Sequence, residues 1–102
     1  MNDKVLNLLG LARRAGKLSI GHDAGVGDLK SGKARLCIIS ADASQRLKDE
    51  INGLCKRLDT KAILSAYTMQ ELGISIGSKS IAVLTVNDEG FAKRIIELTR
   101  EE

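Results

Sequence analysis

A glycine-rich segment could bind the phosphates of a nucleotide. It reads Gly27-Asp-Leu-Lys-Ser-Gly32-Lys33-Ala34 and matches the GxxxxGK pattern of nucleotide-binding loops. That pattern continues with Ser or Thr, whose hydroxyl holds magnesium, whereas this chain has Ala34. The pattern also leads from a buried strand into a helix, and here a helical stretch leads toward a strand. We therefore interpret the segment as a helix end closed by Gly32, and we expect no nucleotide or other cofactor.

The residues that most often carry catalysis or bind metals are few and dispersed. His22 is the only histidine, and no cluster of Cys, His or Asp stands at ligand spacing around it, so no metal site is predicted. Asp23 could orient His22 as a general base, but no nucleophile accompanies the pair. Cys37 and Cys55 fall within apolar patterns and are interpreted as small core residues. We expect a protein that is not an enzyme.

The start of a predicted helix at Gly21-His22-Asp23 offers a second way to bind phosphate. The N-terminus of a helix presents free backbone amides and the positive end of the helix dipole. A solvated helix start explains the same segment equally well. Basic residues stand nearby in the sequence, and we expect them to form one contiguous patch beside Gly21: Arg13, Arg14, Lys17, Lys33 and Arg35.

Positive charge is concentrated in the first third of the chain. Residues 1–35 carry seven basic and three acidic side chains, a net charge of +4, while residues 36–102 carry nine basic and ten acidic ones, a net charge of −1. A basic region suits a polyanionic partner such as nucleic acid, and a lysine-rich solvated surface has the same composition. The aromatic residues, Tyr67 and Phe91, are too few for the stacking platforms that hold single strands. A nucleic acid would therefore be recognised as a folded shape, through charge, backbone amides and helix ends.

Helical and strand patterns alternate along the whole chain. Apolar residues at helical spacing predict amphipathic helices, and continuous apolar runs predict buried strands. Gly25 and Gly27 weaken the second helix, each by ~1 kcal/mol relative to Ala. The order of elements is typical of an α/β fold, a three-layer α/β/α sandwich in which helices cover both faces of one sheet. We predict helices over 3–14, 22–31, 44–58, 68–76 and from 88 onward, and strands over 17–20, 35–41, 62–66 and 81–86.

Length and composition fit a single domain over residues 1–102. The chain is 43% apolar and 28% charged, as globular proteins are. No run approaches the roughly 20 apolar residues that span a bilayer, and the opening MNDKVLNLLG lacks the features of a signal peptide. Two cysteines without CxxC spacing indicate a reducing compartment. We expect a cytoplasmic monomer with no membrane partner.

Four segments, in order and at matching separations, resemble a known family: LLGLARRAGKLSIG, LKSGKARLCIISADAS, QELGISIG and VNDEGFAKRI. They resemble the ribosomal L-seven-Ae/L-thirty-e family of RNA-binding proteins, and most closely its small bacterial YlxQ-type members. The resemblance covers nearly the whole chain and implies an α/β/α sandwich around a mixed four-stranded sheet. It also implies non-catalytic binding of kink-turn or related structured RNA in or near the ribosome. The implied partners are structured RNA, including ribosomal RNA, and ribosomal or translation-factor proteins.

The RNA signature of this family, G-x-N-E-x-x-K at the start of the second helix, is only partly present. Gly21 matches the glycine, but Asp23, Ala24 and Gly27 stand at the Asn, Glu and Lys positions. The second RNA-contacting region of the family, the loop before the last strand, corresponds to Gly77–Ile81. We expect RNA to contact the helix start at Gly21, His22 and Asp23 and the loop at Ser78 and Lys79. We expect it to contact the residues of the basic patch named above as well.

Three functions remain open, of which the third, an enzyme such as a nucleotide hydrolase, would be excluded by an absence of ATP or GTP binding. The first is RNA binding with relaxed specificity, because Asp23 brings a negative charge and neither Ala24 nor Gly27 can contact RNA as Glu and Lys would. The second is a protein-interaction module on the same fold that has lost the RNA site. Restoring Asn, Glu and Lys would create kink-turn affinity only if the rest of the RNA surface is intact.

Overall fold

The helices and strands follow the order that the sequence predicts. A computed structural model describes residues 3–100. The elements are α1 (Lys4–Arg14), β1 (Leu18–Ile20), α2 (His22–Lys30), β2 (Leu36–Ile39), α3 (Gln45–Arg57), β3 (Lys61–Leu64), α4 (Met69–Ser75), β4 (Val83–Val86) and α5 (Glu89–Arg100).

A mixed sheet of four strands, in the order β1-β4-β2-β3, forms the middle layer. β4 runs antiparallel to both of its neighbours, β1 and β2, and β2 runs parallel to β3. Val86, the last residue of β4, lies opposite Leu18 and Leu36, the first residues of β1 and β2. The sheet therefore has one end at which β1 and β2 begin next to Asn87, and an opposite end at which β1 stops before Gly21. We call them the Asn87 end and the Gly21 end.

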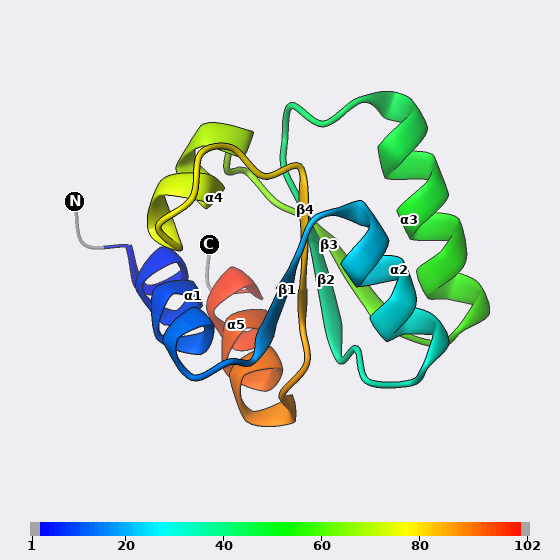
Figure 1. The fold of residues 1–102 in the computed structure, drawn as a ribbon, viewed down its shortest axis with the longest axis horizontal. Coiled ribbons are helices and arrows are strands. Elements are labelled where there is room, and N and C mark those ends of the chain that lie inside the picture. The colour runs from blue at the N-terminus through cyan, green and yellow to red at the C-terminus, as the bar shows by residue number, and fades with distance from the viewer. Residues whose placement is uncertain (1–2, 101–102) are drawn as a thin grey trace.

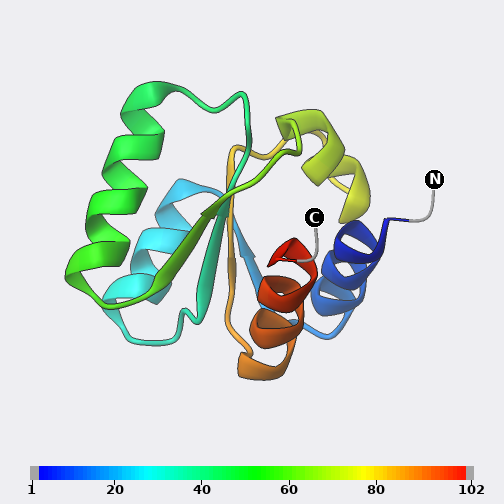
Figure 2. The ribbon, with the colours of Figure 1, turned by 180° about the vertical axis from the view of Figure 1, so that it is seen from behind.

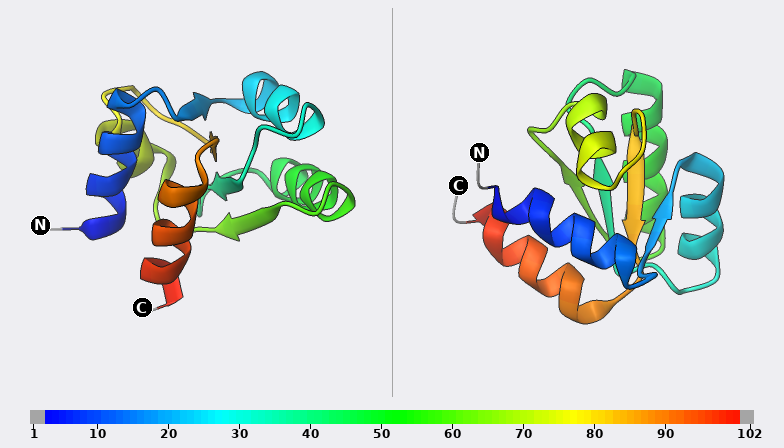
Figure 3. Two further views of the ribbon diagram at one scale, coloured as in Figure 1. Left: turned by 90° about the horizontal axis from the view of Figure 1, so that it is seen from below. Right: turned by 60° about the vertical axis from the view of Figure 1, so that its left-hand side comes forward.

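Helices cover both faces of the sheet, which confirms the predicted three-layer sandwich. α2 and α3 lie on one face, and α1, α4 and α5 lie on the other (Figure 1, Figure 2). The side views in Figure 3 show the two helical layers apart from each other, with the strands between them. Each layer has its own apolar cluster, and both β2 and β4 supply residues to the two clusters. These two strands are buried along their whole length, as their continuous apolar runs predict.

Strand β3 differs from the prediction of a second buried strand over residues 62–66. It lies at the edge of the sheet, where only β2 pairs with it. Its two outer residues, Lys61 and Leu64, are exposed. An apolar run does not distinguish a central strand from an edge strand, because the neighbours of a strand are set by topology.

Helices α1, α2, α3 and α4 all end in the same kind of turn. In each, the residue after the C-cap has a positive φ, and its amide and the next one donate back to carbonyls of the last helical turn. Glycine adopts this conformation readily, and Asp is one of the few other residues that do. The segment Gly27-Asp-Leu-Lys-Ser-Gly32-Lys33 is thus the end of α2 and its closing turn, as predicted. The residues with positive φ in these turns are Gly16, Gly32, Asp59 and Gly77.

The two glycines that weaken α2 differ in what surrounds them. A Cβ at Gly25 would lie 2.7 Å from Oγ1 of Thr85, whereas a Cβ at Gly27 would meet nothing within 4 Å. Gly25 is buried against β4, and Gly27 is exposed. The absence of a side chain at Gly25 therefore lets α2 lie close to the central strand, and Gly27 has no comparable packing role.

We expect opposite effects on stability from alanine at these two positions. Gly27→Ala raises the free energy of unfolding by about 0.5–1 kcal/mol, because it lowers the backbone entropy of the unfolded chain and fits open space. Gly25→Ala lowers it by about 1–3 kcal/mol, because the methyl group forces α2 away from Thr85. Urea denaturation of both variants measures the difference, and changes of the same sign would contradict this account of α2.

Candidate nucleic-acid interface

The residues predicted to bind RNA lie at both ends of the sheet. Gly21, His22 and Asp23 form the start of α2 at the Gly21 end. Ser78 and Lys79 belong to the α4–β4 loop, which crosses the same end before β4 begins (Figure 1). The basic residues belong to the segments before β1 and β2, at or near the Asn87 end: Arg13, Arg14, Lys17, Lys33 and Arg35.

The prediction of one contiguous basic patch beside Gly21 is wrong. The Asn87 amide donates to the Lys17 carbonyl at 2.9 Å, and the Arg35 amide donates to the Val86 carbonyl at 2.8 Å. Both basic residues thus lie at the last residues of β4, whereas Gly21 lies beyond the far end of β1. At roughly 3.3 Å per residue, β1 places Lys17 and Gly21 about 13 Å apart. The residues are close in sequence, but an extended strand separates them in space.

Arg14 belongs to a different part of the surface from the other basic residues. It lines a shallow pocket of about 320 Å³ between α1 and α4, together with Asp3 and Glu71. Both acidic residues face the same pocket, so the charge around Arg14 is mixed.

The start of α2 differs from the starts of the other four helices of the described residues, because no side chain caps it. Gly21 occupies the N-cap position with a φ of 93°, and its carbonyl accepts the first helical bond from Gly25 at 3.1 Å. The amides of His22, Asp23 and Ala24 have no partner within residues 3–100. These three donors and the positive end of the helix dipole together can bind a phosphate oxygen. The capping residues of the other helices are Asp3, Ser44, Thr68 and Asp88.

His22 links the start of α2 to the middle of α3. Its Nδ1 lies 3.0 Å from Oδ1 of Asp23, and its Nε2 lies 2.6 Å from Oε2 of Glu50. The hydrogen bond with Asp23, followed by the one with Glu50, raises the pKa of His22 above its ordinary value, because both carboxylates favour the protonated ring. When His22 is protonated, its positive charge is therefore shared with two carboxylates rather than left free for a ligand.

Sequence reasoning missed the contribution of α3 and its preceding loop to this end. Glu50 bonds to His22, and Lys48 donates to a carbonyl of the loop before α3 at 3.0 Å. In that loop, Asp42 accepts a hydrogen bond from the Met69 amide at 2.8 Å. No sequence pattern indicates the contact of His22 with a residue 28 positions later, since it depends on how two helices pack. The Gly21 end thus combines free amides with mixed charge.

The α4–β4 loop is held firmly against α4. A Cβ at Gly73 would lie 2.2 Å from the Lys79 carbonyl oxygen, so the loop backbone passes directly over the helix. The Ile81 amide donates to the Met69 carbonyl at 3.0 Å and holds the loop where it enters β4. Ser78 and Lys79 are exposed on this loop.

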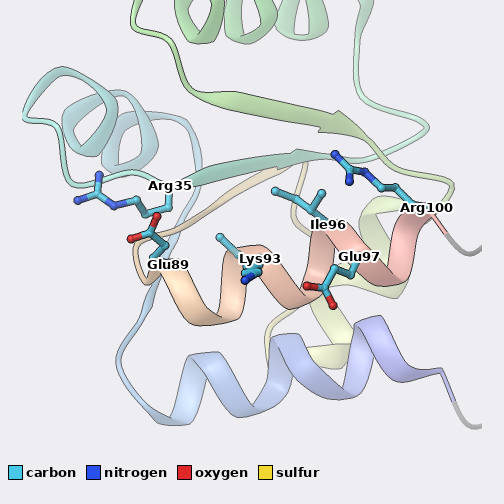
Figure 4. Close-up of a pocket in the computed structure, with 7 residues that line it drawn as sticks. Arg35, Glu89, Lys93, Ile96, Glu97 and Arg100 are labelled. Atoms are coloured by element: carbon cyan, nitrogen blue, oxygen red, sulfur yellow. The ribbon is translucent and has the colours of Figure 1, made fainter.

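Arg35 lines a pocket of about 350 Å³ beside α5 (Figure 4). Its Nη1 donates to the Gly32 carbonyl at 2.8 Å, which holds the guanidinium near the turn after α2. Figure 4 shows the basic and acidic side chains of this pocket interspersed along α5. This mixture gives no concentrated charge, and the pocket has no nucleophile. The remaining lining residues are Glu89, Ala92, Lys93, Ile96, Glu97 and Arg100.

The residues considered for catalysis or metal binding lie in two separate places, His22 at the exposed start of α2 and the two cysteines in the core. Cys37 and Cys55 are both buried in the core, as predicted. The hydrogen bond with Cys55, and then burial, raises the pKa of the Cys37 thiol. Across residues 3–100, His, Cys, Asp and Glu side chains form no group of three that could hold a metal ion. In the same part of the chain, every helix is too short or too polar to cross a membrane.

Comparisons with known proteins agree with this fold. Residues 3–96 match the ribosomal protein L7Ae/L30e/S12e/Gadd45 family. The chain is 32% identical to the RNA-binding protein YlxQ of Bacillus subtilis (strain 168) over 98 residues, covering 89% of this chain and 90% of the relative. A solved structure of a protein with unknown function from Bacillus halodurans C has a TM-score of 0.93 and 31% identity, covering 97% of this chain and 99% of that one. The 15.5kD RNA binding protein of Giardia lamblia shares the fold, with a TM-score of 0.76 and 16% identity over 99% of this chain and 89% of that one.

The link between His22 and α3 predicts a specific pH dependence. We expect the ring protons of His22 to titrate in NMR with a midpoint above the ordinary value of 6.5, and Glu50→Gln to lower that midpoint. Because folding raises the pKa of His22, protonation of its ring stabilises the folded protein. This stabilisation is complete below pH 6.5 and is lost as the pH rises through the pKa of the folded state. Glu50→Gln therefore destabilises the protein more at pH 5.5 than at pH 8.5. Glu97→Gln on α5 is the control, and an equal midpoint in both variants would disprove the link.

Proposed function

This chain belongs to the ribosomal protein L7Ae/L30e/S12e/Gadd45 family, and we propose that it binds structured RNA of the kink-turn class without catalysing a reaction. The binding site is the start of α2, and the ribosome or its assembly provides the RNA. The YlxQ relative of Bacillus subtilis, which is an RNA-binding protein, supports this choice of ligand.

The uncapped start of α2 is the observation that carries the proposal. Four helices have a side chain that accepts their first free amides, and α2 has Gly21 in that place. Glycine leaves the amides of His22, Asp23 and Ala24 open to a ligand acceptor, and it allows an RNA backbone to approach closely. The dipole of α2 adds a favourable interaction with phosphate over the first turn.

The side chains around these amides favour relaxed specificity. Asp23 is fully exposed and places a negative charge where RNA would lie. Ala24 has no group that could bond to a base edge, and one such contact is worth ~1–3 kcal/mol of discrimination. Gly27, one turn later, offers no cation for a phosphate. RNA is then bound through backbone amides and shape, with little reading of the bases.

The protein-interaction module is the second candidate function. Its support is the acidic character of the same surface, where Asp23 and Glu50 flank His22. Two carboxylates beside a helix start weaken its attraction for phosphate and suit a partner protein with basic side chains.

Restoring the family signature tests which candidate holds. The variant combines Asp23→Asn, Ala24→Glu and Gly27→Lys, and we expect it to fold because all three positions are exposed and a Cβ at Gly27 meets nothing within 4 Å. Binding to a kink-turn RNA and to a control without its G·A pairs is measured in parallel at 100 mM salt. We expect the wild type to prefer the kink-turn weakly. The variant should increase this preference at least about tenfold, as one restored base contact of ~1–3 kcal/mol allows.

The matched control combines Asp49→Asn, Asn52→Glu and Gly53→Lys on α3. It makes the same change in net charge at exposed positions, and Gly53 likewise has open space around it. The control should leave the preference for the kink-turn unchanged. If neither the wild type nor the restored variant prefers the kink-turn, the proposal fails and the protein-interaction module takes its place.

A further inference from the structure

A group of basic residues lies at the opposite end of the sheet from the start of α2. Arg13 lies in the last turn of α1 and Lys30 ends α2, while Lys17, Lys33 and Arg35 lie in the segments that lead into β1 and β2. We call these five residues the basic edge. All are exposed, and they belong to the segments that meet at the Asn87 end, where the backbones of Asn87 and Val86 bond to those of Lys17 and Arg35. The role proposed for the start of α2 does not use them.

The same turn places a lysine at the start of both segments. The Lys17 amide donates to the Ala12 carbonyl at 2.9 Å, and the Lys33 amide donates to the Asp28 carbonyl at 2.9 Å. Each lysine directly follows the glycine with positive φ that closes its helix. In the corresponding turns after α3 and α4, the same position holds Thr60 and Ser78. The turn therefore does not require lysine, and the charge at this position needs another explanation.

The carboxylate nearest in sequence to the basic edge is directed inward. Asp28 on α2 is half-buried, and it accepts hydrogen bonds from the Ser19 hydroxyl and from Nδ2 of Asn87, the latter at 2.9 Å. The other acidic residues at this end are Asp59, Asp88 and Glu89, of which Asp88 caps α5. Positive charge therefore dominates on the part of the end formed by the two turns after α1 and α2.

The composition of the basic edge suits the phosphate backbone of a nucleic acid rather than its unpaired bases. Lys17 and Arg35 precede the two strands that flank β4, so their backbones lie about 10 Å apart, twice the ~4.8 Å between neighbouring strands. The guanidinium of Arg35 is held by the Gly32 carbonyl, which limits its freedom before binding. The aromatic residues, Tyr67 and Phe91, are half-buried against the core, so no ring is available here to stack on an unpaired base.

We propose that the basic edge is a second nucleic-acid site, which binds the phosphate backbone of an RNA duplex. The charge of this surface supports the site independently of the function proposed for α2. The choice of RNA rather than DNA as its ligand rests on that proposed function. The two sites lie at opposite ends of β4, so one chain contacts a folded RNA at the start of α2 and a helical segment at the basic edge.

The test compares the variant Lys17→Gln/Lys33→Gln with the matched control Lys4→Gln/Arg94→Gln. All four residues are exposed, so both variants should fold, and each loses the same charge. Binding to a plain RNA duplex is measured between 50 and 200 mM salt, with a DNA duplex of the same sequence as a second arm. We expect the variant to bind the RNA duplex at least about tenfold more weakly at 100 mM salt. In a plot of the logarithm of the affinity against the logarithm of the salt concentration, we expect the magnitude of the slope to fall by about 2. The control should behave as the wild type does.

The outcomes separate the two proposals. The basic edge is overturned if the wild type does not bind the RNA duplex, if both variants weaken binding equally, or if the affinity does not depend on salt. Tighter binding to DNA than to RNA would overturn the choice of RNA. The preference for a kink-turn over its control without G·A pairs is measured in the same variants. If duplex binding requires Lys17 and Lys33 but no preference for the kink-turn is found, the proposal for the start of α2 is rejected and the proposal for the basic edge is retained.

Discussion

Strand β4 pairs with β1 on one side and β2 on the other, and both pairs are antiparallel. All four of its residues are buried between the two apolar clusters, so β4 cannot shift without exposing both layers. Its direction determines which loops meet at each end of the sheet. α2 follows β1 and must begin where β4 begins, while the turn before β1 must lie where β4 ends. The distance between the free amides of α2 and the basic edge follows from this pairing alone.

Helix α2 shows how two kinds of attraction for anions can be kept apart. Its first turn offers amides, which act only on an acceptor at hydrogen-bonding distance and in the right direction. Its last turn and the segment after it carry Lys30 and Lys33, whose charges act over a longer range and are screened by salt. The negative end of the helix dipole stabilises cations there as well. In the two proposals, binding at the first turn therefore depends on the shape of the RNA, and binding at the other end depends on ionic strength.

Local patterns were enough to predict the elements, but not the contacts between them. Ser44 and Thr68 start helices as their capping patterns indicate, and Gly32 and Gly77 follow helix ends. The contact of His22 with α3, in contrast, requires α2 to lie close to the sheet, which Gly25 allows through its approach to β4. Lys17 and Gly21 are neighbours in the sequence, yet the strand between them directs them to opposite ends of the sheet. The resemblance to a family predicts a role in RNA binding for the start of α2, which composition alone could not distinguish from an ordinary helix start.

The two outer strands of the sheet, β1 and β3, are both short. β1 has three residues and β3 has four. An open strand edge offers unpaired amides and carbonyls to other chains, which is how edge-to-edge aggregation begins. At β3 the exposed Leu64 favours such contacts, whereas Lys61 places a charge at the other end of the strand. The Ser65 amide donates to the Ile39 carbonyl at 2.9 Å, so it bonds to β2 and is not available at the open edge. A second copy of the chain would find only a few residues on which to extend the sheet.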